Sequence, residues 1–400
     1  MTDTSLAFAK QPIELSPNGL LTYKTAQNAI AAYEGDDHIY ALYPHKIERA
    51  ARTFVTGFPG DVLYAVKANP HPCLLQNLWD EGVRRFDVAS LREIDLVTDL
   101  LPEAELYLMN PVKSRQTIRE SYARGIRDFA FDHVDELEKI LDCTGHAGDL
   151  NVHLRLALPK SETAMPLSGK YGADFENAVT LLRAARNVSL KLGLCFHVGS
   201  QCLDTEAYDK AIAYARIVTE TANVCIDSLD IGGGFPVAYP DMPIAPMADY
   251  FSAIHSSLIA HGFGDVEILG EPGRALCAEG GSTLTRVELR KGRDLYLNDG
   301  TYGSLFDAGQ FGWKFPVKLH RRGRRAAETA MMPFRFFGPT CDSADTMAGP
   351  FYLPADICEG DWIEVAHLGA YGQTLATGFN GFCSNHTVAI LDDTDGDQNG

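Results

Sequence analysis

The stretch DVLYAVKANPHPCLLQNLWDEGVRRFDVAS (61–90) contains the pattern of a strand, a helix and a second strand, in that order. Its two ends, DVLYAVKAN (61–69) and RRFDVAS (84–90), are short runs rich in apolar residues, as is typical of strands buried on both faces. Between them, residues 72–81 have the apolar spacing of an amphipathic helix. A helix that connects two such strands predicts a unit in which the strands lie parallel.

The same unit recurs along the middle of the chain. Six further apolar runs follow at 104–110, 126–132, 151–159, 190–200, 228–234 and 266–274. Amphipathic segments separate them at 91–100, 114–124, 133–142, 175–186, 205–222 and 247–261, and another at about 45–57 precedes the first strand. Asp132 is placed to cap the helix at 133–142. Eight such units predict an α/β fold, a closed parallel (β/α)8 barrel of the TIM type, better than an open sheet.

The pattern changes after residue 275. Runs typical of strands alternate there with Gly and Pro turns, and no long helical segment is present: STLTRVELRKGRDLYLND (282–299), PFRFFGP (333–339), DWIEVAHL (361–368) and TVAILDD (387–393). This pattern predicts a C-terminal β domain, a small barrel or sandwich. We therefore expect a barrel over 38–275, a β domain over 276–400, and an N-terminal segment, 1–37, that packs with the β domain.

The composition excludes several classes of protein. The 400 residues include 35 Lys+Arg and 53 Asp+Glu, so the net charge is 35 − 53 = −18, which argues against a nucleic-acid partner and suits a small cationic substrate. No apolar run reaches about 18 residues, and the start lacks a signal pattern, so we expect no membrane partner and a cytoplasmic location. The nine cysteines are scattered without CxxC pairs, which favours free thiols and no metal site. We expect the basic run HRRGRR (320–325) to form a solvated loop and the acidic end, 392–400, to fray.

Polar residues gather where the predicted barrel strands end, the face on which such barrels carry their chemistry. In chain order they are Lys67, Asp87, Arg155, His197, Ser200, the glycines 232–234, Glu271, Gly273 and Arg274. Lys67 lies within an apolar run, where it either extends to water or acts as an amine that forms a Schiff base. Three successive glycines either form a simple turn or let backbone N–H groups surround an anion.

Taken together, these residues point to a phosphorylated aldehyde as ligand. Ser200, Gly233, Gly234, Gly273 and Arg274 would bind the phosphate, near the strands where such barrels commonly bind it. Glu271 would keep a pyridine nitrogen protonated, which makes the ring a stronger electron sink, or it would simply pair with Arg274. His197 either stacks on such a ring or is an ordinary core histidine.

The sequence resembles the fold-type III pyridoxal-phosphate-dependent decarboxylases, whose barrel is like that of alanine racemase. Within that family it is most similar to the compact, bacterial-type ornithine and lysine decarboxylases. The motifs that carry the resemblance span about 300 residues in the family's order: YAVKAN (64–69), FDVAS (86–90), FHVGS (196–200), DIGGGFP (230–236), GEPGR (270–274), NDGTYGS (298–304), GPTCDSAD (338–345) and LGAYG (368–372).

The resemblance implies a role for each matching residue. Lys67 would form the Schiff base with pyridoxal 5′-phosphate, and Cys341 would be the catalytic proton donor. The cofactor would be bound by Lys67, Asp87, Arg155, His197, Ser200, Gly233, Gly234, Glu271, Gly273, Arg274 and Tyr371. The substrate would be bound by Asp342, Asp345 and Tyr302. The resemblance further implies a head-to-tail homodimer, in which Cys341 and Asp342 reach the partner subunit's site.

The implied reaction is the decarboxylation of ornithine or lysine, or both, to putrescine or cadaverine and CO2, as in polyamine biosynthesis. Diaminopimelate and arginine decarboxylases are the enzyme alternatives, and a non-catalytic regulator like an antizyme inhibitor is the alternative of another class. Glu271 argues against a racemase, since racemases of this fold place an Arg beside the ring nitrogen. One position departs from the eukaryotic pattern: Gln310 or Phe311 stands where those enzymes carry a second Asp for the distal amine.

Overall fold

Eight parallel strands close into a barrel in the computed structural model, which describes residues 14–15, 19–159, 169–322 and 329–391. In chain order the barrel strands are β4 (Asp61–Ala65), β5 (Arg85–Asp87), β6 (Glu105–Leu108), β7 (Asp128–Phe131), β8 (Asn151–Arg155), β9 (Lys191–Cys195), β10 (Ser228–Asp230) and β11 (Glu267–Gly270). β11 pairs with β4 and closes the barrel. The predicted barrel is confirmed, and its strands are shorter than the apolar runs because the last residues of each run leave the sheet and form the loops at its mouth.

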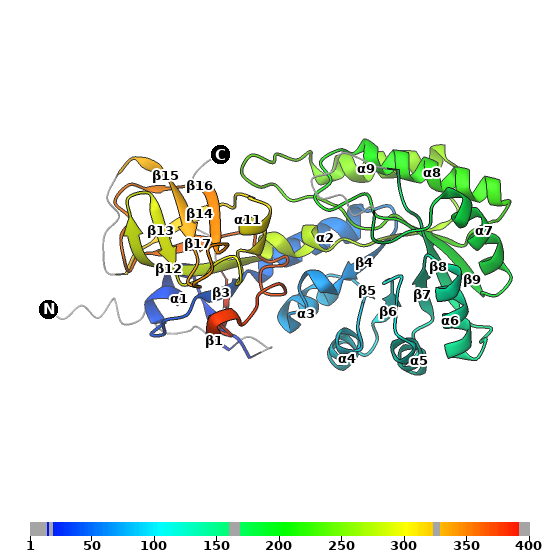
Figure 1. Ribbon diagram of the computed structural model, residues 1–400, viewed down its shortest axis with the longest axis horizontal. Helices are drawn as coiled ribbons and strands as arrows, with labels where there is room; N and C mark the ends of the chain where they lie inside the picture. Colours follow the sequence, from blue (N-terminus) through cyan, green and yellow to red (C-terminus); the bar gives the residue numbers. More distant parts are fainter. Residues whose placement is uncertain (1–13, 16–18, 160–168, 323–328, 392–400) are drawn as a thin grey trace.

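Amphipathic helices surround the barrel (Figure 1). They are α2 (Pro44–Gly57), α3 (Pro72–Asp80), α4 (Leu91–Leu100), α5 (Arg115–Ala123), α6 (Val134–Thr144), α7 (Phe175–Arg186), α8 (Glu206–Ala222) and α9 (Met247–Ala260). The predicted cap of α6 is wrong: His133 is the cap and its Nδ1 accepts from the N–H of Asp135, whereas the Asp132 carboxylate accepts from the N–H of Gly172, at 2.8 Å. None of the helices in the described part of the chain is both long and apolar enough to cross a membrane.

A second sheet takes strands from both ends of the chain. Its ten strands are β1 (Glu14–Leu15), β2 (Leu21–Tyr23), β3 (Ile39–Leu42), β12 (Gly281–Lys291), β13 (Asp294–Leu297), β14 (Val317–His320), β15 (Met331–Phe337), β16 (Thr346–Pro354), β17 (Trp362–Val365) and β18 (Thr387–Ile390). The short helix α1 (Ala26–Ala32) buries Ala29 and Ile30 in the same core as β18. Residues 39–42, which the sequence analysis assigns to the barrel, instead pair with β12 and β18, because the chain enters the barrel only with α2.

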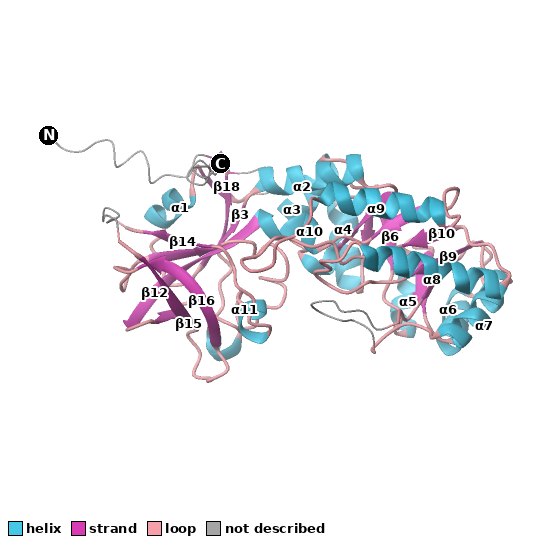
Figure 2. Cartoon of the chain, turned by 90° about the horizontal axis from the view of Figure 1, so that it is seen from above, coloured by secondary structure: helices cyan, strands magenta, loops and turns pink. Residues whose placement is uncertain are grey.

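The two modules lie side by side, with α2 running between them, and Figure 2 shows the same arrangement from above. Hydrogen bonds join the loop after β17 to the turn after β4. The N–H of Tyr371 donates to the carbonyl of Ala68 at 2.9 Å, and Asn69 Nδ2 donates to the carbonyl of Gly369 at 2.7 Å. The β domain therefore contributes directly to the mouth of the barrel.

The basic run at 320–325 is not the solvated loop that we expected, in the part that the structure describes. His320 ends β14 with its ring against Glu364, at 2.9 Å, and Arg321 pairs with Asp356 at 2.6 Å. Both basic residues are buried, which is possible because each has an acidic partner. Residues 323–325 and the acidic end at 392–400 lie outside the described residues.

We expect a pH-dependent contribution to stability from Glu364. Burial opposes its ionisation, but hydrogen bonds with His320, Tyr43 and Ser282 outweigh that effect and lower its pKa from 4.5 to about 2. Because the folded pKa is the lower one, the contribution is complete above pH 4.5 and is lost as the pH falls from 4.5 toward 2. E364Q should lower the free energy of unfolding at pH 7 by about 2–3 kcal/mol.

Urea unfolding of the wild type and E364Q at several pH values measures this contribution. The difference between them should shrink below pH 4.5. E359Q, a change at an exposed glutamate of the same domain, should show no such difference. A difference between wild type and E364Q that stays constant from neutral to acid pH would contradict the assignment.

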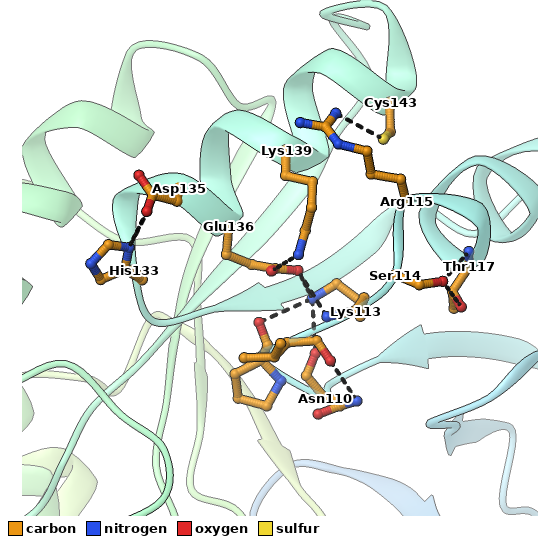
Figure 3. Close-up of polar contacts among 12 residues, drawn as sticks. Asn110, Lys113, Ser114, Arg115, Thr117, His133, Asp135, Glu136, Lys139 and Cys143 are labelled. Atoms are coloured by element: carbon orange, nitrogen blue, oxygen red, sulfur yellow. Dashed lines mark hydrogen bonds and ion pairs between the residues drawn. The ribbon is translucent and has the colours of Figure 1, made fainter.

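A buried lysine joins the ends of β6 and β7 (Figure 3). Lys113 Nζ donates to the carbonyls of Asn110, at 2.8 Å, and Ala130, and lies 3.2 Å from a carboxylate oxygen of Glu136 on α6. Its side chain is completely buried, and burial lowers its pKa to about 8. The sequence analysis missed Lys113, since a lysine in a Pro/Ser turn reads as exposed.

K113M should lower the free energy of unfolding by about 3 kcal/mol at pH 7, because it leaves buried carbonyls without their donor and removes a buried cation from beside Glu136. Urea unfolding measures the change. K210M is the matched control: Lys210 is exposed on α8 and pairs only with surface carboxylates, so its loss should cost less than about 0.5 kcal/mol. Equal effects of the two substitutions would show that the buried contacts of Lys113 contribute nothing.

Candidate active site

One cavity at the mouth of the barrel brings together nine of the predicted residues. They are Lys67, His197, Ser200, Gly233, Gly234, Glu271, Gly273, Arg274 and Tyr371. The cavity is completed by Ala65, Gln201 and Phe235, which the sequence analysis did not single out. Its walls are the loops after β4, β9, β10 and β11 together with the β-domain loop that carries Tyr371, so residues far apart in the sequence form a single site.

Lys67 lies in the 3-10 turn η1 (Val66–Ala68), which directly follows β4. Its Nζ is 3.0 Å from Asp87 Oδ2 at the end of the neighbouring strand β5. Asp87 is buried, while half of the Lys67 side chain is exposed. The negative charge of Asp87 raises the pKa of Lys67. The Asp87 carboxylate therefore holds the Lys67 amine at the wall of the cavity, where a ligand in the cavity could reach it.

Two buried carboxyl groups lie at the ends of β10 and β11. Burial, and then the nearby charges of Asp230 and Asp87, raise the pKa of Glu271 well above its usual range. Burial also raises the pKa of Asp230 to about 6, although this carboxylate accepts from the N–H of Gly232 at 2.8 Å. Each of these two carboxyl groups is therefore harder to ionise than an isolated carboxyl group. Sequence analysis gave no role to Asp230, although an acidic residue that ends an apolar strand is a visible signal.

Two positions of the cavity wall require glycine, because neighbouring atoms leave no room there for a Cβ. A Cβ on Gly233 would lie 3.0 Å from His197 Nε2 and 2.7 Å from the carbonyl oxygen of Glu271. Gly234 has a φ of +102°, and its Cβ would lie 2.5 Å from the carbonyl oxygen of Gly199. Any larger residue at either position would fill the cavity or displace the backbone.

Arg274 supplies the positive charge of the cavity. Its Nη1 lies 3.2 Å from Asp307 Oδ2 and 3.0 Å from the Tyr239 hydroxyl. Its Nε is buried and has no hydrogen-bond partner among the described residues. A guanidinium with an unsatisfied buried N–H suits an anion that carries several acceptor oxygens.

His197 is neutral in this site. Burial, followed by the charges of Arg155 and Lys67, lowers its pKa to about 3. Its Nδ1 accepts from the N–H of Gly199 at 2.9 Å, which fixes the ring. Arg155 ends β8 and is not among the residues that line the cavity. Its positive charge nevertheless lowers the pKa of two residues that do, His197 and Glu271. A fixed, uncharged imidazole is suited to contact with a flat ring.

The other predicted catalytic group lies in the β domain, on a separate cavity. Cys341, Asp342 and Asp345 line that cavity, which shares no residue with the one around Lys67. The thiol of Cys341 donates to Asn380 Oδ1 at 3.3 Å, and the Tyr302 hydroxyl donates to Asp342 Oδ2 at 2.6 Å. A hydrogen bond from the N–H of Ala344, and then that of Tyr302, lowers the pKa of Asp342. This surface therefore presents an exposed thiol beside an ionised carboxylate.

Asp345 does not have the place predicted for it. Its side chain is buried, and its two oxygens accept from the N–H of Thr301 at 2.7 Å and from the N–H and hydroxyl of Thr340 at 3.1 and 2.7 Å. A Cβ on Gly300 or Gly338 would overlap the carboxylate. Asp345 thus holds two loops of the β domain together, and each of its oxygens already accepts at least one hydrogen bond from the protein.

Comparison with known proteins identifies the family. A family model described as "Pyridoxal-dependent decarboxylase, pyridoxal binding domain" matches residues 44–278. This is more than half of the chain, and it covers all eight strands of the barrel.

The chain belongs to the pyridoxal-dependent decarboxylases.

Individual relatives agree with this assignment. A lysine/ornithine decarboxylase of Selenomonas ruminantium is 33% identical over 340 residues, which are 83% of this chain and 84% of the relative. The structure of lysine/ornithine decarboxylase from Vibrio vulnificus, complexed with putrescine, matches with a TM-score of 0.77 at 30% identity and covers 89% of this chain and 95% of that one. The arginine decarboxylase of Paramecium bursaria Chlorella virus matches with a TM-score of 0.80 at 26% identity, over 91% and 98%.

The protein is thus a pyridoxal-phosphate-dependent decarboxylase, and the residues of its cavity fit that cofactor. Lys67 offers an amine to the aldehyde, and Arg274 offers an unsatisfied N–H to the phosphate. The glycine-lined wall leaves room that side chains would fill, and Glu271 in the same cavity is a carboxyl group that could pair with a ring nitrogen. Each chemical part of the cofactor therefore has a matching group in this decarboxylase.

Proposed function

We propose that this decarboxylase converts ornithine and lysine to putrescine and cadaverine with release of CO2. The observation that carries the proposal is the pairing of Cys341 with Asp342 on one exposed surface. A carboxylate held ionised by Tyr302 and by the N–H of Ala344 matches the terminal ammonium of a diamino acid. The overall charge of −18 also favours a cationic substrate.

The proposed mechanism assigns a task to each group of the two cavities. When bound, the cofactor supplies the sink for the electron pair that remains after CO2 leaves. Lys67 would hold the cofactor through its amine, and Asp87 would orient Lys67. Glu271, a buried carboxyl group of the same cavity, would pair with the ring nitrogen of the cofactor and favour its protonated form. The thiol of Cys341 then donates its proton to the former α-carbon.

The mechanism requires Cys341 and Lys67 to meet, and in one chain they lie on separate cavities. We propose that a second copy of the chain brings them together, in a homodimer whose sites are shared. Exposed apolar side chains near Cys341 support this arrangement. Phe379 packs on Tyr302 and Phe382 follows it, and both are more than 40% exposed in a single chain (42% and 46%).

Substrate recognition through Asp342 makes a testable prediction. D342A should raise KM for ornithine and lysine by about 10²-fold, because the substrate ammonium would lose its charged partner. Steady-state CO2 release measures KM. An amino acid without the distal amine, such as norvaline, is the internal control, and D342A should not impair its slow turnover. If KM for the diamino acids stays at the wild-type value, another group reads the distal amine.

The alternatives differ in the end of the substrate that they recognise. Diaminopimelate requires a site for a distal carboxylate, which the ionised Asp342 would repel. Arginine carries a guanidinium that could also pair with Asp342, so arginine decarboxylation is the second candidate. A non-catalytic regulator would not need Lys67, Glu271 and Cys341 together.

The kcat/KM values for ornithine, lysine, arginine and diaminopimelate, measured by CO2 release, test the proposal. We expect ornithine and lysine to exceed the other two by at least about tenfold. Higher values for arginine or diaminopimelate would replace the proposed substrate, and no release from any of the four would favour the regulator. A cytoplasmic location stays a prediction.

A further inference from the structure

Arg274 is enclosed by a segment of the β domain in which the sequence pointed only to Gln310 and Phe311. This segment, 306–313, includes the short helix α11 (Phe306–Gln310). Asp307 Oδ2 lies 3.2 Å from Arg274 Nη1, and the guanidinium carbon lies 4.7 Å from the centre of the Trp313 ring. Both members of the ion pair are less than 10% exposed (7% for the arginine and 6% for the aspartate).

Asp307 acts on Arg274 in two ways. Its carboxylate accepts from Nη1, and its main-chain carbonyl accepts from the N–H of Trp313 at 3.3 Å, which places the indole beside the guanidinium. The same Nη1 donates to the hydroxyl of Tyr239, 3.0 Å away. Contacts on the Nη1 side and on one face of the guanidinium leave its orientation little freedom.

The rest of the guanidinium is left for a ligand. Nε is buried and has no partner in the described part of the chain, and Arg274 lines the same cavity as Ser200 and Gly234. An arginine needs its fork in one orientation to bind a phosphate through two N–H groups. A carboxylate close to a phosphate site would repel the phosphate. The Asp307 carboxylate must therefore contribute something that offsets this repulsion.

We propose that Asp307 is a positioning residue, which holds Arg274 by Nη1 so that its remaining N–H groups face the phosphate of the cofactor. The inference rests on the proposed phosphate-binding role of Arg274, and it adds a residue outside the cavity that acts only through that arginine. Burial raises the pKa of Asp307, while the neighbouring Arg274 lowers it, so the pair depends on both members.

The test compares cofactor affinities of the apo-proteins. Pyridoxal phosphate and unphosphorylated pyridoxal are titrated by absorbance into wild type, D307A, D307N, R274A and the double variant D307A/R274A. D307A should raise Kd for pyridoxal phosphate about tenfold or more and change Kd for pyridoxal less than about twofold, because only the phosphate contact is lost. D307N keeps an oxygen acceptor and should recover most of the affinity. In the R274A background, D307A should have no further effect.

The control is D294A, which removes another Asp–Arg pair of the β domain at an exposed position and should leave both affinities unchanged. An unchanged Kd for pyridoxal phosphate in D307A would overturn the inference. So would an equal loss for pyridoxal, a D307N protein as weak as D307A, or a further loss in the R274A background. The wild-type titration distinguishes a failure of the proposed function from a failure of the inference about Asp307. If wild type binds no pyridoxal phosphate at Lys67, the proposed function itself fails, whatever Asp307 does.

Discussion

K67A should abolish decarboxylation, with kcat lower by roughly 10⁴-fold or more. Among the described residues that line the cavity, Lys67 alone carries an amine that can form a Schiff base with the cofactor aldehyde, and its Nζ lies 3.0 Å from Asp87 Oδ2. Alanine removes the amine and also leaves the buried Asp87 without its cation. The holoenzyme should show the absorbance of a Schiff base near ~420 nm, and K67A should not.

Borohydride reduction followed by peptide mass analysis locates the amine that carries the cofactor. In wild type the reduced adduct should be found on Lys67 alone. K170A is the matched control, since Lys170 is exposed and its Nζ lies over the Tyr171 ring, away from the lining of the cavity, and it should keep both activity and adduct. An adduct on another lysine, or full activity of K67A, would show that the cavity is not the reaction centre.

C341A should have the second largest effect, a decrease in kcat of about 10²–10³-fold. The carbanion-like carbon left by CO2 needs a proton, and the thiol of Cys341 is the donor in the proposed mechanism. Asn380 Oδ1 accepts from both the thiol and the N–H of Cys341, each at 3.3 Å, so the sulfur is held in one place. Without it, more turnovers should place the proton on the cofactor's former aldehyde carbon, after which hydrolysis by water gives a carbonyl product and leaves the nitrogen on the cofactor as an amine.

The ratio of amine to CO2 measures this change directly. It should be close to one in wild type and clearly lower in C341A. C225A, at an exposed cysteine between α8 and β10, should match wild type in rate and ratio. A C341A enzyme with wild-type rate and ratio would remove Cys341 as the proton donor.

The barrel could be predicted because its signal is local. Eight apolar runs alternate with amphipathic segments, and each buried strand shows itself within a few residues. The errors lie where distant contacts decide the outcome. Residues 39–42 fall within the predicted bounds of the barrel, 38–275, yet they pair with β12, more than 230 positions further along the chain. His320 and Arg321 look like part of a solvated loop, yet Glu364 and Asp356 bury them.

The site shows the same division between local and distant signals. Residues in recognisable motifs, such as Lys67 and Glu271, could be predicted from the residues around them. Asp307 could not, because its importance comes from Arg274, 33 positions away, and its own surroundings carry no motif. Asp345 was misplaced for the opposite reason: it lies in the right motif, but its oxygens are all used by backbone and hydroxyl donors.

The central claim is that one site contains Lys67 of one chain and Cys341 of another. Mixing K67A with C341A tests it directly. Each variant alone should be nearly inactive, and a mixed dimer has one site in which both residues are wild type. With differently tagged subunits, the isolated mixed dimer should recover a substantial part of the wild-type activity per dimer, up to about half of it, with ornithine or lysine as substrate. A mixed dimer that forms but stays as inactive as its parents would contradict the account.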